Sequence, residues 1–147
     1  MRRLIDAFNR RFTRFHTRVY VATGGWLGHR MTGPVTSLLL HSTGRRTGLR
    51  RSVALVYARA GDAYLVVASN FGGDRPPAWL ANLRAHPEAE VNIGRHLVKV
   101  TAQVLVPGDG EYEALMAVAD RANRGRYSRY RTMTDRPIPV VRLVPAR

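Results

Sequence analysis

A basic loop in the first half of the chain has the composition of an anion-binding site. The segment 41–51 contains two glycines, a serine, two threonines and four arginines. Glycines let the backbone turn sharply and present its N–H groups, and arginines neutralise phosphate or carboxylate oxygens. The segment is neither a Walker loop nor a dinucleotide-binding loop by its glycine spacing. It predicts binding of phosphate or carboxylate groups, and the alternative is an ordinary solvated hairpin loop.

A second segment, Ala68–Trp79, connects an expected strand to an expected helix and contains Gly72 and Gly73. These glycines allow a planar ligand to approach the backbone, and the N-terminus of the helix offers positive potential to an electron-rich ring edge. The alternative is a plain connecting loop that covers one end of the fold.

A pair of tyrosines near the C-terminus provides candidate hydrogen-bond donors. Tyr127 and Tyr130 are three residues apart, which places both phenols on one side of a helical turn. Either phenol can donate a proton or a hydrogen bond to a substrate. Packing is the commoner role of such a pair, and the residues alone favour it.

The composition excludes several kinds of chemistry. The chain has no cysteine, so redox chemistry would need a bound organic cofactor. No paired carboxylates and no Gly-x-Ser-x-Gly segment indicate a hydrolase. We expect no metal site, because the five histidines share no i, i+4 spacing: His16, His29, His41, His86 and His96.

The elements that must position these residues predict an α+β fold. Short aliphatic runs predict six strands, at 35–41, 52–58, 63–69, 88–93, 97–106 and 139–144. Turns at Gly61-Asp62 and Gly94-Arg95 predict hairpins. Helices are expected at 77–85, at 110–123 with Asp109 as the N-cap, and around 127–131. Mainly antiparallel strands with helices between the hairpins favour a small barrel, because closure removes exposed edges.

Residues 1–30 form a separate basic segment before a domain at 31–147. Apolar residues recur at helical spacing and arginines lie mainly off their stripe, which predicts an amphipathic N-terminal helix followed by a glycine-rich linker. The chain has 23 arginines, one lysine and 10 acidic residues, for a net charge of +14. Residues 1–20 therefore suit an anionic membrane surface, and we expect a cytoplasmic protein at the inner face of the plasma membrane. The alternative is packing on its own domain or on the partner in a homodimer.

Read together, these segments resemble the F420-dependent deazaflavin nitroreductase family, a branch of the split β-barrel flavin-binding proteins. The resemblance covers about residues 38–145. It depends on the order and spacing of these motifs: Thr43-Gly44-Arg45-Arg46-Thr47-Gly48 followed by Arg51, Val67-Ala68-Ser69, Gly72-Gly73, Pro77-Ala78-Trp79, Asn82-Leu83, His86-Pro87, Tyr127 with Tyr130, and Thr134-Asp135-Arg136 before Ile138-Pro139-Val140.

The resemblance implies a split β-barrel enzyme. It implies that reduced coenzyme F420, an 8-hydroxy-5-deazaflavin, delivers a hydride to a quinone, a nitroaromatic or a similar small-molecule acceptor. Tyr127, Tyr130 and Ser69 would be catalytic and face the acceptor. The basic loop would bind the phosphate and glutamate tail, in agreement with its predicted anion binding. The implied cofactor-binding residues are Arg45, Arg46, Thr47, Arg51, Ser52, Val53, Ala54, Leu55, Val56, Val67, Ala68, Ser69, Asn70, Ala78, Trp79 and Asn82.

Two other functions remain open at this point. The same fold could bind FMN or haem in place of F420. A basic nucleic-acid-binding module is suggested by the net charge, but no recognition motif supports it and the arginines are dispersed through the chain. We therefore expect no nucleic-acid partner.

Overall fold

The computed structural model describes residues 36–147. In this part the chain forms seven strands: β1 (Ser37–Thr43), β2 (Arg50–Val56), β3 (Ala58–Ala60), β4 (Ala63–Val67), β5 (Glu88–Ile93), β6 (His96–Leu105) and β7 (Val140–Pro145). Its helices are a 3-10 helix, η2 (Asn70–Gly72), and the α-helices α2 (Ala78–Ala85), α3 (Tyr112–Ala122) and α4 (Arg126–Arg131). None of these helices is long and apolar enough to cross a membrane. The helix and linker expected in residues 1–30 lie outside the described residues, as does the start of the first expected strand.

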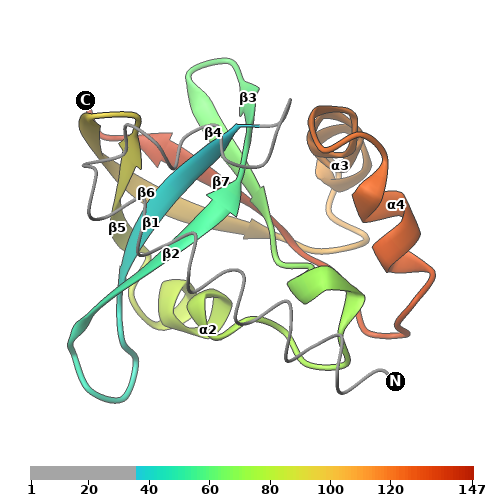
Figure 1. The fold of residues 1–147 in the computed structure, drawn as a ribbon, viewed down its shortest axis with the longest axis horizontal. Helices are drawn as coiled ribbons and strands as arrows, with labels where there is room; N and C mark the ends of the chain where they lie inside the picture. Colours follow the sequence, from blue (N-terminus) through green and yellow to red (C-terminus); the bar gives the residue numbers. More distant parts are fainter. Residues whose placement is uncertain (1–35) are drawn as a thin grey trace.

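The strands form one antiparallel sheet in the order β2-β1-β5-β6-β7-β4-β3. β2 and β3 lie at opposite ends of this order, yet only Tyr57 separates them along the chain. The sheet must therefore curl until its two edges meet at Tyr57, as the ribbon shows (Figure 1). This curled sheet is the expected split β-barrel.

The prediction of six strands was wrong at this corner. The expected strand 52–58 is divided between β2, which pairs with β1, and β3, which pairs with β4. Tyr57 belongs to neither strand, and its N–H donates to the carbonyl oxygen of Thr36 at 3.2 Å. The run is apolar on both sides of Tyr57, and apolar character does not indicate where a strand changes its partner.

Both predicted two-residue turns are confirmed. Ala60 pairs with Ala63 around Gly61-Asp62, and Ile93 pairs with His96 around Gly94-Arg95. Both glycines have positive φ, +61° at Gly61 and +59° at Gly94, as tight hairpin turns require.

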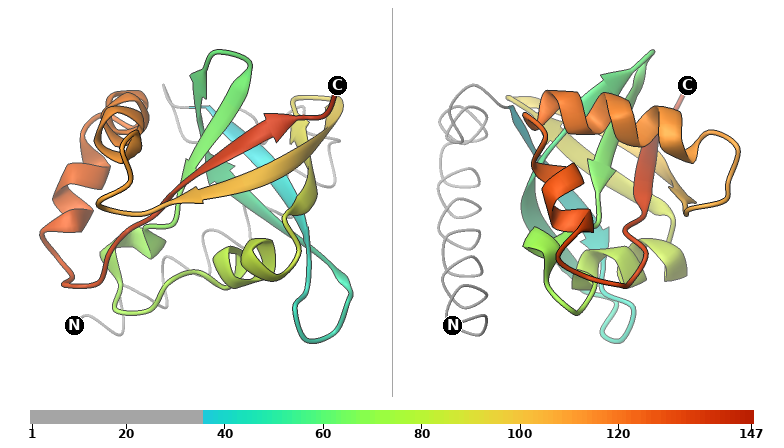
Figure 2. Two further views of the ribbon diagram at one scale, coloured as in Figure 1. Left: turned by 180° about the vertical axis from the view of Figure 1, so that it is seen from behind. Right: turned by 90° about the vertical axis from the view of Figure 1, so that its right-hand side faces the viewer.

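The two faces of the sheet are covered by different helices. Successive strand residues point to opposite faces. Tyr64 and Val66 of β4 pack in one cluster with Leu80 and Leu83 of α2. Leu65 of β4 packs in a second cluster with buried residues of α3 and α4: Tyr112, Met116, Ala119 and Tyr127. Figure 2 shows α2 beneath the curled sheet and α3 with α4 along its side.

The predicted N-cap of α3 was wrong. α3 begins at Tyr112, and Asp109 instead accepts a hydrogen bond from the N–H of Val106 through Oδ2 at 2.8 Å. The aspartate thus stabilises the turn that leaves β6. The Tyr112 hydroxyl donates to the carbonyl oxygen of Ile138 at 2.7 Å, which attaches α3 to the segment before β7.

Candidate active site

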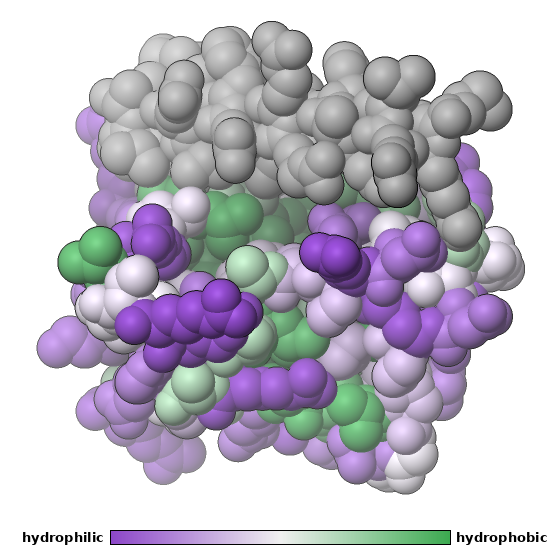
Figure 3. Space-filling view, turned by 90° about the horizontal axis from the view of Figure 1, so that it is seen from below, coloured by the Kyte–Doolittle hydropathy of each residue, from purple (hydrophilic) through white to green (hydrophobic). Residues whose placement is uncertain are grey.

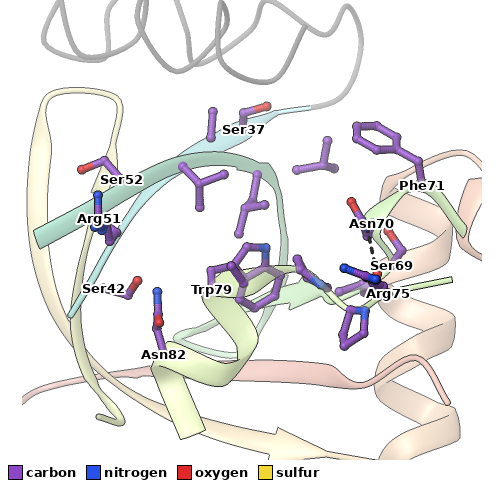
Figure 4. Close-up of a pocket in the computed structure, with 18 of the residues that line it drawn as sticks. Ser37, Ser42, Arg51, Ser52, Ser69, Asn70, Phe71, Arg75, Trp79 and Asn82 are labelled. Atoms are coloured by element: carbon purple, nitrogen blue, oxygen red, sulfur yellow. Dashed lines mark hydrogen bonds between the residues drawn. The ribbon is translucent and has the colours of Figure 1, made fainter. Parts of the chain in front are cut away.

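One cavity of about 850 Å³ brings together the three segments that the sequence indicated. It lies between the β1–β2 hairpin, the segment that follows β4, the start of α2, and α4. From below, hydrophobic surface lies in a hollow among hydrophilic residues (Figure 3). In the close-up, Ser42, Arg51 and Asn82 gather toward one end and Ser69, Asn70 and Phe71 toward the other (Figure 4). The cavity therefore has two chemically different ends.

Strand β2 forms one wall of the cavity. Six consecutive residues of this strand, 51–56, line it. Since successive side chains of a strand point to opposite faces, a lining without gaps means that the cavity runs along the edge of β2. Within residues 36–147, β2 pairs with β1 only, so its other edge is the one that faces the cavity.

The loop between β1 and β2 places arginines at the polar end. Its backbone closes on itself: the Gly44 N–H donates to the Leu49 carbonyl oxygen, and the Gly48 N–H donates to the Gly44 carbonyl oxygen, both at 2.8 Å. A Cβ at Gly44 would lie 2.8 Å from Thr47 Oγ1, so any other residue there would displace the Thr47 side chain. Arg45, Arg46, Thr47 and Arg51 all line the cavity.

The positive charges of these arginines are available to an anionic ligand. Among the described residues, no carboxylate forms an ion pair with Arg45, Arg46 or Arg51. Asn82 of α2 accepts hydrogen bonds from Arg45 through Oδ1, at 3.1 Å from the backbone N and 3.4 Å from Nη1. Helix α2 therefore fixes the loop without neutralising it.

A buried hydroxyl at the same end lacks a hydrogen-bond partner. Ser42 is 3% exposed, and its Oγ forms no hydrogen bond within the described part of the chain. A buried polar group without a partner costs roughly 1–3 kcal/mol. Ser42 lines the cavity, so an oxygen-rich ligand would satisfy it. The donor set at this end fits a polyanion.

The middle of the cavity is apolar. Val53, Leu55 and Val67 line it together with Ala78 and Trp79 from the start of α2. Trp79 is 7% exposed, and its ring stands in the cavity between the two ends (Figure 4). Such a slot fits a flat ring system.

The other end is aromatic. Phe71 and Tyr130 have ring centroids 6.3 Å apart, as do Tyr127 and Tyr130, and both pairs meet edge to face. Burial raises the pKa of Tyr127, the neighbouring Tyr130 raises it further, and a hydrogen bond with Asn123 opposes the shift. The Tyr127 hydroxyl therefore stays protonated at neutral pH and can donate a hydrogen bond.

Comparison with known proteins identifies the family. The profile of the F420H(2)-dependent quinone reductase family matches residues 12–145. The chain belongs to this family. An F420H(2)-dependent quinone reductase of Mycobacterium tuberculosis is 46% identical over 128 residues, which cover 87% of this chain and 86% of that protein.

Solved structures agree with this family. The structure of an F420-H2 dependent reductase has 32% identity and a TM-score of 0.65, and the match covers 76% of this chain and 94% of that chain. A second structure, described as a domain-swapped dimer, has 31% identity and a TM-score of 0.68, with 88% and 95% covered. This F420H(2)-dependent reductase thus uses F420, as the resemblance implied.

The quinone reductase cavity contains nearly every residue implied by the resemblance. Ala68 is the exception. It is fully buried and packs in the cluster that contains Leu80 and Leu83 of α2, because its side chain points to the face of the chain opposite that of the adjacent Ser69. The residues that line the cavity are Arg45, Arg46, Thr47, Arg51, Ser52, Val53, Ala54, Leu55, Val56, Val67, Ser69, Asn70, Ala78, Trp79, Asn82, Tyr127 and Tyr130.

Sequence reasoning missed several lining residues. Ser37 comes from β1, where no glycine or charge marks it in the sequence. Ser42 lies inside the predicted anion-binding segment 41–51 but is not among the residues that the resemblance implied. Phe71 and Arg75 belong to the segment 68–79, so including that whole segment would have found them. Asn123 and Arg126 lie just before the tyrosine pair, and the remaining lining residues are Gly44, Pro76 and Pro77.

Proposed function

We propose that F420 lies along β2, with its anionic tail at the β1–β2 loop and its ring beside Ser69 and Asn70. A quinone, a nitroaromatic or a similar acceptor would then occupy the aromatic end. The observation that carries this proposal is the continuous change along one cavity, from arginines that have no ion pair within residues 36–147, through an apolar slot, to phenols. When bound in its reduced form, F420 supplies a hydride to such acceptors.

The basic end would hold the tail of the coenzyme. Arg45, Arg46 and Arg51 provide charge-assisted hydrogen bonds to phosphate and carboxylate oxygens. Ser42 would add a hydroxyl that has no other described partner. Thr47 helps to hold the loop in shape, since its Oγ1 accepts from the Leu49 N–H at 3.2 Å.

The apolar slot would orient the ring and exclude water. Trp79 and the side chains of β2 confine a flat ring between them, which is how a protein places a reacting carbon against an acceptor. Tyr127 would donate a hydrogen bond to the acceptor oxygen as negative charge develops there. Tyr130 and Ser69 would complete the acceptor contacts.

Two broader parts of the proposal concern the whole protein. Residues 1–20 would bind the anionic surface of a membrane, where lipid-soluble quinones are found, and their basic amphipathic sequence supports this. A homodimer is also proposed, supported by the relative whose structure is described as a domain-swapped dimer.

A fluorescence titration with oxidised F420 tests the binding mode. Arg51→Ala should weaken binding about 10- to 150-fold, because a lost charge-assisted contact costs roughly 1.5–3 kcal/mol. The deficit should be largest at low salt, where charges are least screened. Arg95→Ala is the matched control, because Arg95 is exposed in the β5–β6 turn away from the cavity. Equal affinities of wild type and a folded Arg51→Ala protein would overturn the tail assignment.

A further inference from the structure

The segment after β4 has an unusual backbone held by one arginine. Arg136, which precedes β7, donates to carbonyl oxygens through all three guanidinium nitrogens. Nη2 lies 2.7 Å from the oxygen of Ser69, Nε 3.0 Å from that of Gly73, and Nη1 3.3 Å from that of Ala68. The side chain is half-buried and does not line the cavity.

These contacts determine the direction of two N–H groups. In a trans peptide, the carbonyl oxygen and the following N–H point in opposite directions. The Ala68 and Ser69 carbonyl oxygens point to Arg136, so the N–H groups of Ser69 and Asn70 point away from it. Both residues line the cavity. Within residues 36–147, neither N–H donates to another protein group.

The backbone conformation of this segment also turns the Ser69 and Asn70 N–H groups to one side. Ser69 is right-handed, with φ −81° and ψ −31°, and Asn70 is left-handed, with φ +44°. A right-handed residue followed by a left-handed one turns successive N–H groups to the same side and forms an anion-binding concavity. Phe71, at φ +55°, continues the left-handed stretch. Non-glycine residues adopt this conformation at a cost, so other contacts must hold it.

Arg136 supplies three such contacts, beside the hydrogen bond from Asn70 Nδ2 to the Arg75 carbonyl oxygen at 2.9 Å and that from the Gly72 N–H to the Ser69 carbonyl oxygen at 2.9 Å. Its position behind the turn also places a positive charge on the side opposite the cavity. Burial lowers the pKa of Arg136, and the carboxylate of Asp74 opposes the shift. The guanidinium stays charged at physiological pH because arginine side chains start above a pKa of about 12.

We propose that Arg136 is a positioning residue that holds the Ser69 and Asn70 N–H groups toward the cavity, where they stabilise the electron-rich ring of reduced F420. This inference rests on the proposed placement of the coenzyme ring. Reduction adds electron density to the ring, so these donors should favour the reduced form over the oxidised form. Arg136 would thereby tune the reduction potential of the bound coenzyme without touching it.

The test compares the affinities of oxidised F420 and F420H2. The ratio of the two dissociation constants reports the shift in reduction potential on binding. Arg136→Lys and Arg136→Met should change this ratio about fivefold or more, with F420H2 losing more affinity, as expected for one weakened hydrogen bond. A merely structural role would lower both affinities equally and leave the ratio unchanged.

Arg142→Met is the matched control. It removes an arginine that contacts Gln103 at 2.8 Å and Glu111 at 3.0 Å, away from the cavity. Its ratio should equal that of the wild type. Arg51→Ala should weaken both forms together, because the tail does not change on reduction.

Amide NMR on the wild-type protein provides a second measurement that needs no variant to fold. On addition of F420H2, the Ser69 and Asn70 amide protons should move downfield, as expected for new hydrogen bonds. Unmoved amides, or an unchanged affinity ratio in a folded Arg136 variant, would overturn the role of Arg136 while leaving the proposed function intact. Failure of the wild type to bind either form would overturn both.

Discussion

The hydroxyl of Tyr127 is the group on which the proposed chemistry depends most. Tyr127 is 5% exposed, and burial holds its pKa above the usual tyrosine value, so it donates rather than ionises across the neutral range. Tyr127→Phe should keep F420 affinity and lower single-turnover oxidation of bound F420H2 by a quinone about tenfold or more. Between about pH 6 and 9 the deficit should stay constant, because the phenol does not titrate there.

Tyr130→Phe is the comparison for that experiment. Tyr130 lies against both Phe71 and Tyr127, so its ring shapes the acceptor end and its hydroxyl should matter less. If both phenylalanine variants retain wild-type turnover, neither hydroxyl is catalytic and the proton must come from water or Ser69.

Lining residues of the cavity could be predicted from the sequence where the residue type itself indicates ligand binding. The arginines and glycines at 44–51 predict an anion site from composition alone, and most of them line the cavity. Ser42 was predictable only as a member of the segment 41–51, because its individual significance depends on being buried without a hydrogen-bond partner in the described part of the chain. The left-handed conformation of Phe71 was not predictable either, since phenylalanine rarely adopts positive φ and nothing in its residue type indicates it.

At the scale of elements, the β1–β2 loop can be tested through a glycine. Gly48 has φ +69° and nothing within 4 Å of an added Cβ. Glycine is therefore favoured at this position by the backbone conformation and not by a lack of space. Gly48→Ala should lower the free energy of unfolding by about 1–2 kcal/mol. Gly110 also has open space but no positive φ, and Gly110→Ala should be neutral or stabilising by up to about 1 kcal/mol. Chemical denaturation of the two variants measures the difference, and equal stabilities would show that the loop relaxes.

Strands could be predicted from apolar runs and turn residues where strands that are adjacent in the sequence pair with each other. Hairpins closed by Gly61-Asp62 and Gly94-Arg95 needed only two adjacent runs and a glycine. The division of the run 52–58 at Tyr57 depends on the strands that pair with each half, and the residues of the run do not contain that information. The site shares this limit, because β1, α2 and α4 meet at the cavity only through the curl of the sheet.

At the scale of the whole molecule, the net charge of +14 leads to a prediction for membranes. Replacing Arg10, Arg11 and Arg14 with glutamine in the full chain should reduce co-sedimentation with vesicles rich in phosphatidylserine by about a hundredfold, since each basic residue contributes about 1 kcal/mol near such a surface. Replacing three arginines elsewhere, Arg84, Arg95 and Arg121, keeps the net charge matched and should have less effect. Equal losses in the two variants would show that total charge, rather than residues 1–20, drives any binding.

The position of β7 governs when this protein can become functional during synthesis. The last strand along the chain lies between β6 and β4 in the interior of the sheet, with four registered pairs to β4 and six to β6. Until it emerges from the ribosome, β4 and β3 have no connection through the sheet to β6, and the barrel cannot close. A nascent chain that already contains every described residue of the cavity, up to Tyr130, would still be unable to bind coenzyme. A frameshift or stop codon between Tyr130 and Val140 should therefore abolish binding as fully as one before the cavity residues.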